Sequence, residues 1–493
     1  MKYLVIIGMA LLTMSSCSKD FLKEDPKSSI TPSNFYQSAS DLDAAVRGII
    51  VLNNLAWNQT GGLACTFGSD DITTWRGGNK FDISDFDTYQ PNSSNAKMII
   101  WWDYFYQVIK SSNQLILKYQ DATQATETER NNAAGAAYFF RAMDYFFLTR
   151  TWGSVPMPLG VTTDTTSLST PDEIYTQIVS DLKNAESMLP DAWTGESVVS
   201  GYQTLPTTGS AKALLANVYL TMAGWPLKQT DKYALAAEKA GEVIDNASKY
   251  GYGLLDSCSY LWDGLHHVNK EIVFGAFYNY VFSWANQNQM GPMNTAAGEE
   301  GGWDELFGEI SFYNKFPAGP RKDATYQTVY YQNNDHSKAV DYTKLLKAHP
   351  YFWKYRETGL LVDPLTHAMS NWESSATMYI IRYPEVLLTY AEAKAMSSGV
   401  DQSAYDAINQ VRKRAGLEDL QTGLSQTAFR DSVIAERGWE FAGPEPAARW
   451  FDLIRTETVA QANKDRSSAE ETIVGQPNDE THSFYWAPLP AIM

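Results

Sequence analysis

The chain of 493 residues is 44% apolar and 13% aromatic, a composition that excludes an intrinsically disordered protein and can supply a large core. Its 39 basic and 57 acidic residues leave a net charge of −18, which disfavours nucleic acids and anionic membrane surfaces as partners. Neutral or cationic partners are favoured instead.

The N-terminus has the layout of a lipoprotein signal peptide. Lys2 is followed by an uncharged run from Tyr3 to Leu12 and then by small polar residues up to Cys17. A transmembrane helix needs about 20 apolar residues, and this run is too short. We expect residues 1–16 to be removed and Cys17 to carry acyl chains, because more than one chain is needed for stable membrane anchoring. The polar, proline-containing residues that follow Cys17 then form a tether.

The first half of the mature chain carries apolar residues at helical spacing in several long segments. In one of them Ala136, Phe140, Met143 and Phe147 share a face, and in another Pro171 opens a helix with acidic residues behind it, as the helix dipole prefers. The spacing predicts helices over residues 98–119, 130–150, 171–189, 210–223 and 232–245.

A different composition follows from Gly251 to about Ala376. This region is rich in Gly, Asn, Pro, Tyr and Trp, and it contains the short strand-like runs EIVFGAFYNY and TMYIIRY. Such a composition builds loops and small sheets, and loops on a rigid scaffold are common sites of binding residues. We therefore expect the ligand to bind in this region.

Helical spacing resumes in RYPEVLLTYAEAKAM and continues in SAYDAINQVRKRAGL, where Gly416 marks a stop. Alanine opposite large aromatic residues, in helix pairs of about 34 residues, is typical of tetratricopeptide packing, although a generic helical bundle produces the same stripes. The predicted fold class is mainly α: a tetratricopeptide-like scaffold of helical pairs with an irregular, loop-rich subdomain containing short β-strands.

The expected organisation has six parts. They are a signal peptide (1–16), a lipidated tether and N-terminal segment (17–40), a first part of the helical scaffold (41–250), an irregular ligand-binding region (251–376), a second part of the scaffold (377–460) and an irregular C-terminal segment (461–493).

The sequence gives no support for a metal enzyme or a cofactor. The six histidines contain no H-E-x-x-H pattern. With Cys17 lipidated, Cys65 and Cys258 remain, and they either pair or stay buried as thiols. The stretch DISDFD at 82–87 lacks the glycine and terminal glutamate of an EF-hand loop, so we expect a solvated loop there.

Seven segments of the chain follow one another in a distinctive order. They are CSKDFLKEDPKSSITPSNFYQSASDLDAAVRG, WWDYFYQVIKSSNQLI, AAYFFRAMDYFFLTRTWGSVPMPL, GSAKALLANVYLTMAGWP, IRYPEVLLTYAEAKA, INQVRKRAGL and ERGWEFAGPEPAARWFDLIRT. In this order they resemble the SusD/RagB-like outer-membrane lipoproteins of Bacteroidota, and the resemblance covers nearly the whole mature chain. Two departures from the family pattern are the insertion AGPEPAA at 442–448 and the end of the sequence soon after a proline-rich strand.

The resemblance implies a cell-surface lipoprotein of the outer membrane that has no catalytic activity. Such a protein binds an oligosaccharide or polysaccharide on its irregular face and delivers it to a SusC-like TonB-dependent transporter. Some relatives handle peptides instead, so a peptide-binding member of the family is an alternative.

Tryptophans outside the helical stripes are the candidate sugar contacts, because a pyranose presents an apolar face that stacks on an aromatic ring. Trp101, Trp102, Trp439 and Trp450 lie on apolar helical stripes and are predicted to be core. The candidates for the glycan face are Trp75, Arg76, Tyr280, Trp284 and Trp303, which lie in segments rich in glycine and amide residues.

An envelope glycoside hydrolase on a helical scaffold is the main alternative function. It would need two carboxyls facing a cleft at a set separation. The acidic residues Glu436, Glu440 and Asp452 lie among helical apolar residues with arginines close by, which favours structural ion pairs over a catalytic pair. A third hypothesis is a structural repeat protein that holds another protein in its helical groove.

Overall fold

The computed structural model describes residues 35–58, 60–161, 167–279, 288–327, 329–331, 337–356, 361–363, 368–369, 374–446 and 449–491. Cys17 and the predicted signal peptide lie outside these residues, and so do Tyr280 and Trp284.

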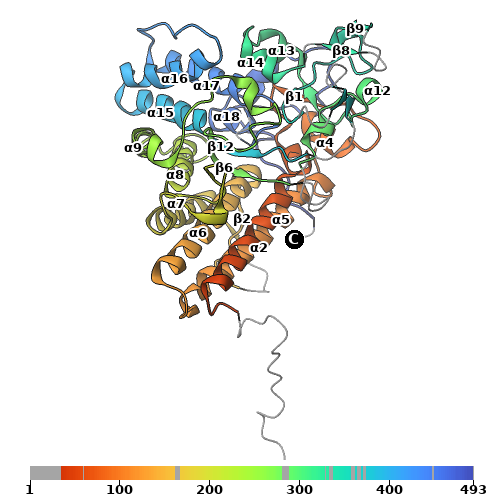
Figure 1. Ribbon diagram of the computed structural model, residues 1–493. Helices are drawn as coiled ribbons and strands as arrows, with labels where there is room; N and C mark the ends of the chain where they lie inside the picture. Colours follow the sequence, from red (N-terminus) through yellow and green to blue (C-terminus); the bar gives the residue numbers. More distant parts are fainter. Residues whose placement is uncertain are drawn as a thin grey trace, which may run out of the picture.

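The fold is mainly α, as predicted, and its long helices occupy the segments with helical spacing (Figure 1). The longer helices are α2 (Ala39–Trp57), α5 (Ala96–Lys118), α6 (Glu127–Trp152), α7 (Pro171–Met188), α8 (Thr208–Ala223), α9 (Lys232–Asp245), α15 (Tyr383–Ser398), α16 (Gln402–Arg414) and α17 (Gln426–Glu440). The short helices are α3 (Thr60–Leu63), α4 (Phe81–Asp87), α10 (Ala247–Tyr250), α11 (Met290–Met293), α12 (Ala297–Glu300), α13 (Ile310–Lys315), α14 (Pro320–Thr325), α18 (Arg449–Arg455) and α19 (Val459–Ala462).

The long helices pack as successive antiparallel neighbours, as tetratricopeptide-type pairs do. Helix α2 packs on α5 and α6, and contacts then run from α5 to α6, α7, α8 and α9 in chain order. After the irregular region the chain returns to the same scaffold, because α15 packs against α9 and then against α16 and α17. The two helical parts of the sequence therefore form one continuous stack.

Local sequence fixes where these helices begin. The Thr170 hydroxyl accepts a hydrogen bond from the backbone N–H of Glu173, whose carboxylate reaches back to the Thr170 N–H, and Pro171 occupies the first turn. The same reciprocal cap, between Thr126 and Glu129, opens α6. Such caps satisfy donors that a helix start leaves unpaired.

The strands of the described residues form six two-stranded antiparallel sheets. Their bounds are β1 (Ile72–Thr73) with β7 (Phe307–Gly308), β2 (Val155–Pro156) with β3 (Leu168–Ser169), β4 (Val198–Val199) with β5 (Tyr202–Gln203), β6 (Ile272–Ala276) with β12 (Met378–Arg382), β8 (Tyr330–Tyr331) with β9 (Ala339–Val340), and β10 (Leu361–Asp363) with β11 (Ala368–Met369).

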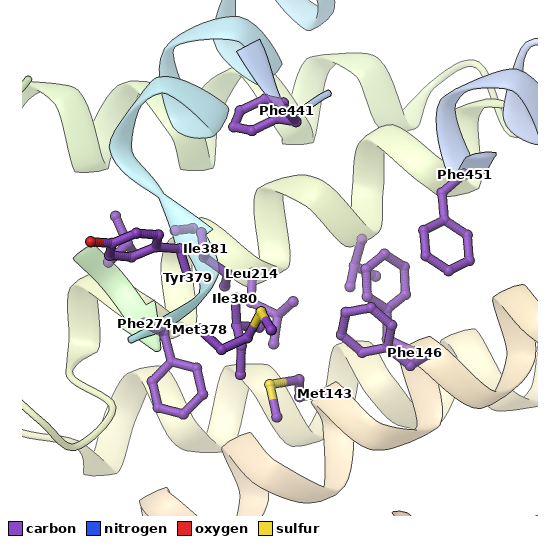
Figure 2. Close-up of a cluster of buried hydrophobic side chains, with 14 of the residues drawn as sticks. Met143, Phe146, Leu214, Phe274, Met378, Tyr379, Ile380, Ile381, Phe441 and Phe451 are labelled. Atoms are coloured by element: carbon purple, nitrogen blue, oxygen red, sulfur yellow. The ribbon is translucent and has the colours of Figure 1, made fainter. Parts of the chain in front are cut away.

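The pair β6–β12 joins the irregular region to the scaffold. Both strands are buried along their whole length, and they correspond to the two strand-like runs of the sequence. Figure 2 shows Phe274 of β6 and Met378 of β12 packed against Met143 of α6 and Leu214 of α8. The irregular region starts and ends on this buried pair, because β12 leads directly into α15.

The tryptophans predicted to be core are inside. Trp101 is fully buried, Trp102 and Trp450 are buried, and Trp439 is half-buried against the main core. Cys65 and Cys258 are both buried and unpaired, so the described residues contain no disulfide. Among the described helices none is long and apolar enough to cross a membrane.

A buried network of ion pairs holds the base of the irregular region. Arg382, the last residue of β12, contacts the carboxylates of Glu271, Glu440 and Glu445 at 3.1, 2.7 and 2.8 Å. Lys354 also pairs with Glu445. Residues from strand β12, helix α17 and three loops therefore share one set of charges, all of them almost wholly inaccessible to solvent.

Further arginines extend the network along the helices. Arg414 of α16 pairs with Glu271 and Glu440, and Arg321 of α14 pairs with Glu436 at 2.6 Å. Burial raises the pKa of Glu440, but the surrounding arginines outweigh burial and hold the pKa far below its usual range. The Glu440 carboxylate is therefore ionised at neutral pH.

Replacement of Arg382 by Met tests this network. Because Arg382→Met leaves three buried carboxylates short of a partner, we expect the free energy of unfolding to fall by about 3–5 kcal/mol. Urea denaturation measures the change. The matched control is Lys413→Met, which breaks an exposed pair with Asp419 and should cost less than about 1 kcal/mol. Equal losses in the two variants would contradict the assigned role.

Candidate functional site

Trp75 lies in a loop at the irregular end of the molecule. It follows β1, which pairs with β7, and in Figure 1 these strands gather with α12, β8 and β9 away from the lower ends of α2 and α6. The half-buried ring packs against a small cluster made of Ala296, Phe307, Tyr330, Leu345 and Tyr351. This cluster is separate from the main core, so it supports the loops rather than the helices.

The position of the Trp75 ring is set by specific contacts. Its indole N–H donates to the backbone carbonyl of Asp304 at 3.1 Å. The ring lies against Gly77, where an added Cβ would be 1.8 Å from a ring carbon, so a larger residue would displace the indole. The ammonium group of Lys347 lies 3.2 Å from the ring centroid and therefore covers one face of the ring.

Asp304 connects Trp75 to Trp303. The Asp304 carboxylate accepts hydrogen bonds from the Tyr351 hydroxyl at 2.6 Å and from the backbone N–H of Ala297 at 2.8 Å. The half-buried ring of Trp303 packs against the main core. This hydrogen bond brings the Trp75 indole to the backbone beside Trp303, while the two rings pack against different clusters.

Arg76 is exposed beside Trp75. Its guanidinium group pairs with Asp85 at 2.6 Å and lies 5.2 Å from the ring centre of Phe81, while its backbone N–H donates to Glu471 at 2.7 Å. Phe81 is itself 49% exposed, so it adds a second accessible ring.

The loop after β9 supplies residues that the sequence did not single out. Leu346 is 72% exposed, and its backbone N–H donates to Glu299 at 2.7 Å. Lys347 follows it. Nothing in the local sequence distinguishes these residues from an ordinary surface loop, because their contacts to Trp75 and Glu299 are made by segments far away in the chain. We call Trp75, Arg76, Phe81, Trp303, Leu346 and Lys347 the Trp75 face.

Tyr280 and Trp284 lie outside the described residues, so the structure does not place them relative to the Trp75 face. Of the five predicted ligand contacts, Trp75 and Arg76 are neighbours, and Trp303 is linked to Trp75 through the backbone of Asp304.

Buried charges support the face from behind. His349, two residues after Lys347, contacts one carboxylate oxygen of Glu470 at 2.9 Å. The other oxygen of Glu470 accepts the backbone N–H of Ile310, and Glu309 accepts the backbone N–H of Ser467. Asp87 accepts hydrogen bonds from Thr73 of β1 at 2.9 Å and from Arg466 at 2.8 Å. Burial raises the pKa of Asp87 to about 6, although Arg466 opposes the shift.

The prediction of a solvated loop at 82–87 is wrong. This stretch lies within helix α4, and Asp85 and Asp87 are buried. Their partners Arg76 and Arg466 come from other loops, so each of these two carboxylates has a cationic partner inside the fold. Among the described residues no group of three or more side chains has the arrangement of a metal site.

The carboxylates considered for hydrolysis are structural ion pairs, as favoured from the sequence. Glu436 and Glu440 are buried in the network around Arg382 and Arg321. Asp452 contacts Arg437 at 2.7 Å and Arg455 at 2.8 Å and is also buried. These carboxylates do not face a cleft in which a glycosidic bond could lie between them.

Three surface pockets lie away from the Trp75 face, on both flanks of helix α2. Their volumes are about 390, 480 and 340 Å³. Their linings are mainly aliphatic and small polar side chains with few aromatic rings, and Trp193 stands at the edge of one of them. Because these pockets have few aromatic rings on which a sugar could stack, the Trp75 face is the better candidate for a sugar-binding site.

Comparisons with known proteins place the chain among SusD-like proteins. A model described as the SusD family matches residues 280–490, and a model described as starch-binding and associating with the outer membrane matches residues 20–220. The SusD-like protein P2 of Formosa agariphila is 27% identical, over 99% of this chain and 96% of its own length.

Solved structures agree with this fold. A SusD homologue from Bacteroides thetaiotaomicron has a TM-score of 0.76 at 24% identity and covers 93% of this chain and 95% of its own. A chain named a laminarin-binding SusD-like protein has a TM-score of 0.71 at 22% identity and covers 92% of this chain and 99% of its own.

The pH dependence of stability tests the support behind the face. Burial lowers the pKa of His349, but the hydrogen bond and charge of Glu470 outweigh burial and raise it. A raised histidine pKa gives stability that is fully present below the unfolded value near 6.5 and is lost as the pH rises through the folded value. His349→Gln should therefore cost about 1–3 kcal/mol at pH 6 and clearly less at pH 8 in urea denaturation.

The control for this measurement is His266→Gln. His266 contacts Asp263 at 2.7 Å in an exposed loop, and its loss should change stability by less than about 0.5 kcal/mol. An equal loss for His349→Gln at both pH values would rule out a charged pair.

Proposed function

We propose that this chain, which belongs to the SusD family, binds an oligosaccharide or polysaccharide at the cell surface and delivers it to a SusC-like TonB-dependent transporter without catalysis. The observation that carries the proposal is the Trp75 face: an indole, a second exposed ring and two cationic side chains on loops anchored to a rigid helical stack. A similarly folded protein that is named for laminarin binding supports the ligand class.

Ring stacking supplies affinity of a suitable size. Covering roughly 100 Å² of an indole at about 25 cal/mol/Å² contributes about 2–3 kcal/mol. Two such contacts, less the cost of immobilising a flexible glycan, correspond to a dissociation constant in the millimolar to micromolar range. A protein that must release its ligand to a transporter needs affinity of this order. A long polymer that touches several sites would bind more tightly through avidity.

The proposed ligand contacts are Trp75, Arg76, Tyr280, Trp284 and Trp303. Trp75 and Trp303 are tied through Asp304, and Arg76 adds hydrogen-bond donors at the edge of the ring. Tyr280 and Trp284 are included because of their sequence context, in which amide side chains follow the aromatic residues.

The state of the acidic residues supports the proposal of binding without hydrolysis. General acid–base cleavage of a glycoside needs one carboxyl protonated and another ionised on opposite sides of the bond. Glu436, Glu440 and Asp452 are buried and each contacts arginine, so they serve the fold. The carboxylate of Asp304, next to Trp303, accepts hydrogen bonds from the Tyr351 hydroxyl and from the backbone N–H of Ala297.

Acylation of Cys17 would hold the protein on the outer membrane. The described chain begins at Phe35, so the tether of residues 17–34 could extend by at most about 60 Å. We propose that this reach keeps the protein beside an outer-membrane transporter while the Trp75 face stays open to glycan.

A glycan-binding measurement tests the proposed site. Trp75→Ala should weaken binding about 10- to 100-fold, because it removes one stacked ring. Affinity electrophoresis and calorimetry against a panel of plant, algal and host glycans measure the change. Reducing ends are followed in the same samples, and their release over time would contradict binding without catalysis.

The matched control is Trp193→Ala. Trp193 is also half-buried and its indole N–H also donates to a backbone carbonyl, that of Pro206, at 2.8 Å. It lies beside the α2 pockets rather than on the Trp75 face. Loss of binding in both variants, or in neither, would contradict the assignment of the site.

Membrane attachment is tested at Cys17. In cells, Cys17→Ser should move the protein from the membrane fraction to the soluble fraction, because no acyl chain can then be attached. Mass spectrometry of the wild-type N-terminal peptide measures the acyl mass directly. A wild-type protein found without acyl chains in the envelope would overturn the anchoring proposal.

A further inference from the structure

The ammonium group of Lys347 is the one feature of the Trp75 face that a neutral sugar does not explain. It lies 3.2 Å from the centroid of the Trp75 ring, on the face that a stacking ligand would need. In the described part of the chain it forms no ion pair with a carboxylate. Among the residues that the structure describes, the Trp75 ring is the one close partner of this ammonium group.

The acidic residues nearby are committed to other partners. Asp85 pairs with Arg76, and Glu471 accepts the backbone N–H of Arg76. Asp304 accepts from Tyr351 and from a backbone N–H, and Glu299 accepts the backbone N–H of Leu346. None of these carboxylates pairs with Lys347, so an incoming anion would not have to displace one.

The segment that carries Lys347 is locally basic, although the whole chain is acidic. Between residues 337 and 347 three lysines, Lys338, Lys344 and Lys347, accompany one acidic residue, Asp341. At physiological ionic strength charges more than about 8 Å apart are largely screened. The charge that a ligand meets at Trp75 is therefore set by these neighbours rather than by the net charge of −18.

Displacement of Lys347 has a cost that depends on the ligand. A cation over an aromatic ring is attracted to the negative potential of the ring face. A neutral sugar that stacks on Trp75 breaks the contact between Lys347 and the ring and provides no charged partner for the ammonium group. A sugar that carries a carboxylate or a sulfate offers the displaced ammonium a charged partner at the edge of the same ring.

We infer that the Trp75 face binds an acidic glycan, one that carries uronic carboxylates or sulfate esters, and that Lys347 moves off the indole to pair with the acidic group. This inference rests on the proposed function and refines its ligand class. It replaces the expectation, drawn from net charge, that neutral or cationic partners are favoured. Arg76, 35% exposed at its side chain, provides a second cation for a neighbouring acidic sugar.

The test measures binding of four defined probes by calorimetry: alginate oligosaccharides for carboxylates, carrageenan oligosaccharides for sulfates, and laminarin and xyloglucan oligosaccharides as neutral glycans. We expect an acidic probe to bind and the neutral probes to bind at least tenfold more weakly. Affinity for the acidic probe should fall as NaCl rises from about 50 to about 500 mM.

Substitutions at Lys347 separate charge from shape. Lys347→Met should weaken binding of the acidic probe roughly three- to tenfold while leaving neutral probes unchanged or bound more tightly, because the ring is uncovered. Lys347→Arg should retain binding of the acidic probe. The matched control is Lys344→Met, which removes an equal charge from the same turn without touching Trp75 and should change affinity less than twofold.

Each outcome decides a different claim. If a neutral probe binds tightly and its affinity does not fall in Lys347→Met, this inference is overturned. The proposed glycan-binding function would remain intact. Binding of the acidic probe that is insensitive to both salt and Lys347→Met would also overturn it. No binding of any probe by the folded wild-type protein would contradict both the inference and the proposed function.

Discussion

The ion pairs around Arg382 are the constraint on which the rest of the structure depends. The irregular region leaves and rejoins the helical stack through β6 and β12, and Arg382 ends β12 between carboxylates from β6's neighbouring loop and from α17. Burying charges is costly unless each is paired and hydrogen-bonded, so this arrangement is stable only when the segments meet in one geometry. The loops that carry Trp303, Leu346 and Lys347 lie between these two strands and are thereby fixed to the scaffold at their base.

The Trp75 face itself is held by a second, smaller set of contacts. A separate apolar cluster, the Trp75–Asp304 hydrogen bond and the His349–Glu470 pair fix the loops to one another. The helical stack therefore provides rigidity, and short polar contacts provide the local geometry. This division lets the loops change their ligand contacts without altering the packing of the helices, as binding sites on a scaffold commonly do.

Helices were predictable from the sequence because their signals are local. Apolar spacing located α5 to α9, and the structure places α9 at the predicted residues Lys232–Asp245. The partner of each strand was not predictable, since nothing in EIVFGAFYNY says that it pairs with a strand about a hundred residues later. The buried helix α4 was missed for the same reason: the arginines that make its acidic residues tolerable come from distant loops.

The candidate site shows the same limit. Trp75, Arg76 and Trp303 could be selected because their segments lack helical periodicity, and the structure links the two segments through the Trp75–Asp304 hydrogen bond. Lys347 could not be selected, because a lysine in a surface loop has no local signal for a distant ring. Its position over Trp75 is nevertheless the contact that most constrains the ligand, because a sugar that stacks on the ring has to displace the ammonium group and needs an acidic group to pair with it.

The most direct test of the account is hydrogen–deuterium exchange of the protein with and without a bound glycan. The account predicts slower exchange in the loops at residues 74–81, 297–306 and 342–349, with exchange in α2 and in α5 to α9 unchanged. Protection confined to the flanks of α2, with none in those three loops, would contradict it.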